Sequence, residues 1–126
     1  MPSDLKFNST LRIIEIVHTG VVSRDDLRRS TNEVIALQQE HSVDGVLIDA
    51  TELESISITD LSDLPSQYNE GGASRSCPVA LVKPLAPETH RLAQFYDNVC
   101  NYRGWSVQQF ESRDEAVVWL TSDQSS

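Results

Sequence analysis

The apolar positions along the chain follow two spacings, one typical of strands and one typical of helices. Short apolar runs rich in β-branched residues predict buried strands, whereas apolar residues three and four positions apart predict helices with one buried face. The predicted strands are Leu5–Asn8, Leu11–His18, Val46–Asp49, Pro78–Lys83 and Trp105–Phe110. The predicted helices begin near Ser23, Thr59, Pro87 and Ser112.

The order of these elements predicts an α/β fold in a single domain covering residues 1–126, with an ordered core from about 5 to 121. The polar turn Asn8-Ser9-Thr10 joins the first two strands into an antiparallel hairpin. Strands and helices alternate after that, which favours parallel pairing. We therefore expect a mixed, mostly parallel sheet of about five strands with helices packed on it.

The stretch from Gly45 to Leu61 is the predicted centre of the sheet and of any binding edge. Its strand is expected to end at Asp49, and the next helix to begin at Thr59 as N-cap. Pro65 lies too deep for a first helical turn, so this helix is predicted to be short or kinked. The polar run 68–76 contains a Gly-Gly pair and is predicted to be a mobile loop.

The charge of the chain argues against nucleic-acid binding. The formal net charge is −9, and the 10 lysine and arginine residues are scattered rather than clustered, whereas phosphate contacts need clustered basic side chains. No apolar run approaches the roughly 18 residues of a membrane span, and the first residues lack a signal-peptide pattern. We expect a cytoplasmic protein without membrane insertion.

Few residues offer catalytic or metal chemistry. Cys77 and Cys100 have neither a C-x-x-C partner nor zinc spacing, which predicts reduced, partly buried thiols and no metal site. Asp49 is the strongest polar candidate, either facing a functional crevice or hydrogen-bonding the residues that follow it. An enzyme would have to use Cys77, or His18 with Asp49, and we expect no catalytic residues, no cofactor and no enzymatic activity.

A group of hydroxyl side chains surrounds the predicted start of the second helix. Its members are Ser55, Ser57, Thr59 and Ser62. A helix start attracts phosphate through its free N–H groups, although Asp60 and Asp63 would repel a phosphate there. Capping and turn hydrogen bonds explain the same hydroxyls without a phosphate.

The element order resembles a STAS domain, the fold of anti-sigma-factor antagonists, and more closely the SpoIIAA-like family of small bacterial proteins. The resemblance rests on the passages 46–51, 58–61, 102–105 and 110–120. In antagonists, a serine in an Asp-Ser-Ser-Gly stretch at this helix start is phosphorylated. The corresponding residues here are Ser57-Ile58-Thr59-Asp60, in which Thr59 keeps a hydroxyl near the acceptor position.

The resemblance implies a non-catalytic regulatory or binding module that contacts a protein partner. It also implies an alternative, a carrier of an apolar, lipid-like ligand held between sheet and helices. We place the binding surface at Asp49, Thr51, Ser57 and Thr59, next to the loop 68–76, with Thr59 as the candidate phosphoacceptor. A homodimer is compatible with these expectations.

Overall fold

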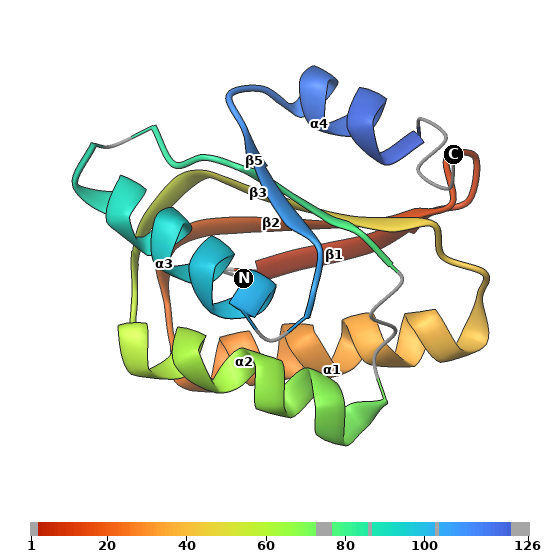
Figure 1. Ribbon diagram of the computed structural model, residues 1–126, viewed down its shortest axis with the longest axis horizontal. Coiled ribbons are helices and arrows are strands. Elements are labelled where there is room, and N and C mark those ends of the chain that lie inside the picture. The colour runs from red at the N-terminus through yellow and green to blue at the C-terminus, as the bar shows by residue number, and fades with distance from the viewer. Residues whose placement is uncertain (1–2, 73–76, 86, 103, 122–126) are drawn as a thin grey trace.

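The computed structural model describes residues 3–72, 77–85, 87–102 and 104–121, which form one mixed sheet with helices on both of its faces (Figure 1). The strands are β1 (Ser3–Asn8), β2 (Ile13–Val22), β3 (Gly45–Ile56), β4 (Val79–Val82) and β5 (Val107–Phe110). The α-helices are α1 (Arg24–Glu40), α2 (Ile58–Gly71), α3 (His90–Tyr102) and α4 (Arg113–Thr121), and a short 3-10 helix, Pro87–Thr89, precedes α3.

The strand order follows the chain, β1-β2-β3-β4-β5, and the predicted fold class is confirmed. β1 and β2 pair antiparallel, with Lys6 opposite Glu15. All later pairs are parallel, and in the central pair Val46 lies opposite Val79. Each parallel pair needs a helical crossover, which α1, α2 and α3 supply.

The helices divide the core into two layers. α1, α2 and α3 cover one face of the sheet, and α4 lies on the other (Figure 1). Because side chains alternate along a strand, Ile14, Val46 and Ile48 belong to the larger core, whereas Ile13 and Leu47 pack with α4.

The helix ends predicted from capping residues are confirmed where the chain follows common capping rules. The Ser23 hydroxyl accepts a hydrogen bond from Asp26 N at the start of α1. At the start of α4, the Ser112 hydroxyl accepts a hydrogen bond from Glu115 N and donates one to the Glu115 carboxylate. Gly104, with φ of 92°, follows α3 in the left-handed conformation that glycine adopts readily. Among the described helices, none has the length and apolar composition to cross a bilayer.

The predicted ends of the second and third strands were wrong. β2 continues past Gly20 to Val22, and β3 continues seven residues past Asp49 to Ile56. The pairing between them shifts register twice, so that β3 has extra residues between Asp49 and Glu52 and again between Leu53 and Ser55. These β-bulges disturb the alternation of buried and exposed residues, which is why the strand pattern seemed to stop at Asp49.

The prediction of a short or kinked second helix was also wrong. α2 runs for 14 residues through Pro65, and its N-cap is Ser57 rather than Thr59. It ends at Gly71 and is capped by Gly72, which has a φ of 81°, so residues 68–71 are helical instead of forming a loop. The rest of the predicted loop, residues 73–76, lies outside the described residues.

Candidate functional site

Asp49 uses its carboxylate to hold the first bulge of β3. Its Oδ1 accepts hydrogen bonds from the backbone N of Thr51 at 3.0 Å and from the Thr51 hydroxyl at 2.7 Å. The register shift against β2 begins at this point. Both side chains are half-buried. Asp49 and Thr51 are thus in contact, and the local hydrogen-bonding role considered for Asp49 is what the structure shows.

The start of α2 exposes the two other predicted site residues. The Ser57 hydroxyl accepts from Asp60 N at 3.4 Å, and the Ser57 carbonyl accepts from Leu61 N at 3.0 Å. Thr59 lies in the first turn with an exposed side chain, and its carbonyl accepts a hydrogen bond from the Ser62 hydroxyl. Ser57 therefore caps the helix, and Thr59 is available at the surface.

The structure separates the predicted site residues into two pairs. From Thr51 the strand continues to Ile56 before Ser57 begins the helix, a span of roughly 15–20 Å at the usual rise of a strand. Gly72 lies at the opposite end of α2, roughly 20 Å from Ser57 for a helix of this length. The described part of the predicted loop, residues 68–72, therefore lies away from the start of α2.

The capping roles can be tested by two matched substitutions. Ser57→Ala should lower the free energy of unfolding by about 1 kcal/mol, because it removes the side-chain acceptor for Asp60 N. Thr59→Ala should change it by less than about 0.5 kcal/mol, since Thr59 is exposed and does not cap the helix. Urea unfolding of both variants measures the difference, and a larger loss for Thr59→Ala would contradict this assignment.

A cavity of about 80 Å³ lies between the sheet and helices α1, α2 and α3. Its walls are mainly aliphatic and aromatic side chains of the larger core. The polar side chains among them are His18, Ser30, Thr31, Gln38, Tyr68 and Tyr96. Of these residues, the sequence analysis named only His18, and it did so for catalysis with Asp49. The others were missed because a cavity depends on how side chains from several elements pack together.

His18 is the most unusual of these polar residues. It lies on β2, is 7% exposed, and its Nδ1 is 2.8 Å from the Ser3 hydroxyl on β1. Burial lowers the pKa of His18 to about 4, so the ring is neutral at pH 7.

The predicted catalytic combinations do not form. Val17 pairs with Asp49, and the adjacent His18 points to the other face of the sheet, into the larger core. Cys77 is a free, buried thiol whose pKa burial raises to about 11, which disfavours the nucleophilic thiolate. Cys100 is likewise free and buried, and burial raises its pKa to about 12. In the described residues, the geometry supports neither His18 with Asp49 nor Cys77 as a nucleophile.

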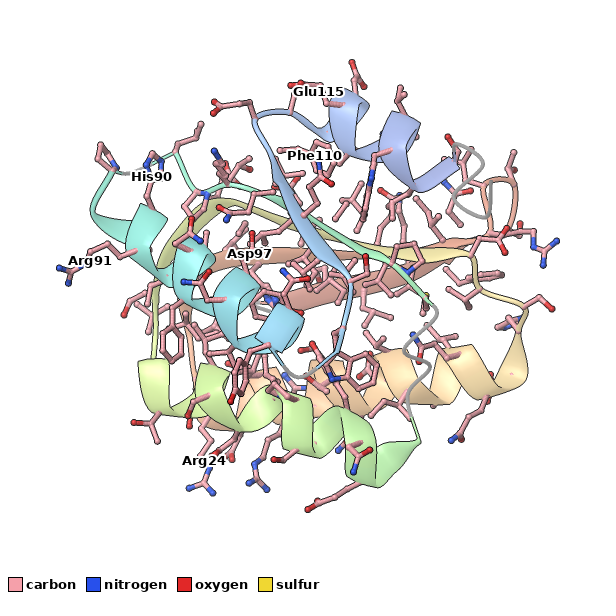
Figure 2. The ribbon with its side chains drawn as sticks, viewed as in Figure 1. Arg24, His90, Arg91, Asp97, Phe110 and Glu115 are labelled. Carbon is pink, nitrogen blue, oxygen red and sulfur yellow. The ribbon has the colours of Figure 1, made fainter. Side chains whose placement is uncertain are left out.

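The two tyrosines of the cavity bind each other. The Tyr68 and Tyr96 hydroxyls are 2.9 Å apart, and burial raises the pKa of both. Tyr68 also packs edge-on against Trp105, with ring centroids 5.2 Å apart. Asp97 of α3 lies toward β5 (Figure 2) and accepts a hydrogen bond from Gln109. These contacts fix α3 over the cavity.

Within the described part of the chain, no group of three histidine, cysteine or acidic side chains is arranged to hold a metal ion. The features that remain as candidate sites are the exposed start of α2 and the cavity beneath the helices.

Comparison with known proteins gives a likeness of structure. No family model and no curated protein sequence matches the chain. The structure of the anti-sigma factor antagonist SpoIIAA in its unphosphorylated form is 13% identical, with a TM-score of 0.62 over 94% of this chain and 96% of that one. An uncharacterised protein of the DUF3478 family from Shewanella loihica PV-4 is 18% identical, with a TM-score of 0.62 over 94% of this chain and 91% of that one. The chain therefore has the SpoIIAA-like fold, as its sequence predicted.

Proposed function

We propose that the chain is a non-catalytic regulatory module that binds a protein partner through the start of α2. The observation that carries this proposal is the fold, which is similar over 94% of the chain to that of an anti-sigma factor antagonist. Ser57 and Thr59 are exposed at that helix start. Side chains there are accessible to a partner, and the N–H groups of the first turn favour negatively charged groups.

The neighbouring start of α1 extends this surface. Gln67 of α2 donates hydrogen bonds to the Arg28 carbonyl and to the Asn32 side chain of α1, so the two helices lie side by side. A shallow depression between them is lined by Arg24, Leu27, Arg28, Asp60, Asp63 and Gln67. Arg24 points away from the helix pair toward solvent (Figure 2). A partner would thus meet charges of both signs, and its binding should weaken as salt is added.

Thr59 is the residue through which we propose that this binding is regulated. A phosphate on its hydroxyl would add up to two negative charges beside Asp60 and Asp63. Arg24 and Arg28 line the same depression as these acids and would be drawn toward the phosphate. Phosphorylation would therefore change the charge pattern that the partner meets.

Asp49 and Thr51 contribute indirectly in this proposal. Their hydrogen bonds hold the bulge that sets the direction of the last part of β3, and that strand leads directly into α2. Asp49→Ala should therefore weaken partner binding less than a change at Thr59 does.

The proposal predicts that Thr59→Glu abolishes partner binding without unfolding the protein. Immobilised wild-type and variant proteins would be incubated with lysate of the source organism, and the retained proteins quantified by mass spectrometry. The wild type should retain a partner, and Thr59→Glu should retain at least tenfold less of it, because the new carboxylate adds charge at the contact. Binding of the purified partner would then be measured by calorimetry.

Thr10→Glu is the matched control, because it adds the same charge at an exposed threonine in the turn between β1 and β2. It should retain the partner as the wild type does. Equal retention of every protein by Thr59→Glu and wild type, with unchanged circular dichroism, would overturn the proposed surface.

Small-ligand binding is the second candidate function, and the apolar cavity favours it. The cavity is far smaller than the several hundred cubic ångströms of sites for drug-sized ligands. A long-chain lipid therefore does not fit the structure as it stands.

A further inference from the structure

We propose that the cavity between the sheet and α1, α2 and α3 binds a small, uncharged, largely apolar molecule that bears one hydroxyl group. This inference deepens the second candidate function and is independent of the surface at the start of α2. It rests on the size of the cavity, on the polarity of its walls and on two buried polar groups within it.

The size of the cavity limits the ligand to a few atoms. An apolar cavity of about 150 Å³ accepts benzene, and a water molecule occupies about 30 Å³ of the liquid. The 80 Å³ available here is roughly half the benzene-binding volume. The expected ligand is therefore a chain of three to five non-hydrogen atoms. Ligands of four or five such atoms would need small movements of the cavity walls.

The walls exclude charged ligands. No lysine, arginine, aspartate or glutamate lines the cavity, the imidazole ring of His18 is neutral at pH 7, and burial raises the pKa of Tyr68 and Tyr96. A carboxylate or an ammonium group would lose its hydration without gaining an opposite charge, which is strongly unfavourable. The ligand must therefore be neutral.

Two buried polar groups of the walls retain hydrogen-bonding capacity. Among the hydrogen bonds of the described residues, His18 uses only Nδ1, toward Ser3, and the Thr31 hydroxyl takes part in none. By contrast, the Ser30 hydroxyl donates to the Leu27 carbonyl, and the tyrosine hydroxyls bind each other. Nε2 of His18 and Oγ of Thr31 thus remain for a ligand.

A hydroxyl group suits these partners better than other neutral groups do. Either the Ser3 hydroxyl donates to Nδ1 and the ring proton of His18 is on Nε2, or the ring proton is on Nδ1 and donates to the Ser3 oxygen, so Nε2 is either a donor or an acceptor. A hydroxyl both donates and accepts and therefore matches either tautomer. A carbonyl would match only one of them.

The cavity also approaches the surface along one side. Most wall residues are buried, but Gln38, Tyr68 and Leu92 are half-buried. Movement of these side chains from three different helices would admit a small molecule without unfolding the sheet.

The test uses xenon and 1-butanol as ligands of the full-length protein, followed by nuclear magnetic resonance. Xenon reports on an accessible apolar space, and 1-butanol adds the hydroxyl. We expect both to shift the methyl signals of Ile48 and Leu81 in the wall, with millimolar affinity for butanol, as befits a ligand of five non-hydrogen atoms.

Four variants separate the effect of the free space in the cavity from that of the hydrogen bond to His18. Ala93→Leu fills the space from α3 and should abolish both sets of shifts, whereas Ala36→Leu makes the same change on the exposed side of α1 and should preserve them. His18→Leu should weaken butanol about fivefold and retain xenon, as expected for the loss of one hydrogen bond. Ser3→Ala removes the partner of Nδ1 but keeps Nε2, so butanol should still bind.

Absence of xenon shifts in the wild type would overturn the proposal, as would butanol shifts that persist in Ala93→Leu. If Ala93→Leu does not fold, Ala50→Val on β3 fills the same cavity with a residue suited to a strand. Thr59→Glu should bind butanol as the wild type does. If xenon and butanol do not bind, the proposed protein-binding surface is unaffected. If no protein partner is retained, the cavity proposal is unaffected.

Discussion

Replacing Arg113 with alanine should lower the free energy of unfolding by about 2–3 kcal/mol at pH 7, because it leaves a buried carboxylate without its cation. The Glu15 side chain is 6% exposed and lies in the sheet beneath α4. Arg113 donates to its Oε1 through Nε at 3.1 Å and Nη2 at 2.7 Å, and Asn8 donates to Oε2. The Arg113 side chain is 45% exposed, so water partly reaches the pair and moderates the loss.

The cause of the loss can be isolated by a double-mutant cycle in urea. Adding Glu15→Gln to Arg113→Ala should recover much of the stability, because it removes the unpaired charge. Lys83→Ala is a control that breaks an exposed ion pair with Glu111 and should cost less than about 1 kcal/mol. A loss for Arg113→Ala no larger than that of the control would show that the buried pair is not important for stability.

The same contacts control the ionisation of Glu15. Burial alone would raise the pKa of this carboxyl, but hydrogen bonds from Arg113 and Asn8 and the charges of Arg113 and Lys6 outweigh burial and lower it. The stabilisation is thus present above the ordinary pKa of 4.5 and is lost as the pH falls through the lowered value. The Arg113–Glu15 pair was not foreseen, because 98 positions separate the two residues in the chain.

The strand order was predictable because local patterns and general rules of chain topology agree. The hairpin turn after Asn8 and the alternation of strands with amphipathic helices leave few arrangements, and parallel pairing of β3 with β4 follows from them. The ends of β3 and α2 were not predictable in the same way, because tertiary packing decides them. Leu64 and Pro65 are buried against the core, so packing outweighs the hydrogen bond that proline cannot make.

The candidate sites were predictable only in part. Hydroxyl side chains at the start of α2 follow from local sequence, although the N-cap was assigned to Thr59 instead of Ser57, two positions away. The role of Asp49 depends on a bulge, and the bulge depends on the register against β2. The cavity has no local signal at all, because its walls come from three strands, three helices and the connections between them.

Lowering the pH from 7 to 5 should reduce the free energy of unfolding by about 2 kcal/mol because of His18. Burial lowers the pKa of His18 from 6.5 to about 4, so the unfolded chain binds the proton more readily than the folded one. Stability is therefore highest above pH 6.5, declines as the pH falls from 6.5 toward 4, and levels off below that for this group. Each unit of difference between the two pKa values corresponds to about 1.4 kcal/mol.

The measurement is urea unfolding at pH 7, 6 and 5, where protonation of carboxylates contributes little. His18→Leu removes the titrating ring and should flatten the dependence over this range, whatever its stability at pH 7. His41→Gln replaces an exposed histidine at the end of α1 and should keep the wild-type slope. A slope that persists in His18→Leu would assign the acid sensitivity to other groups. Flattening in His18→Leu alone would establish that the ring is held neutral by burial, which is the state that the proposed ligand requires.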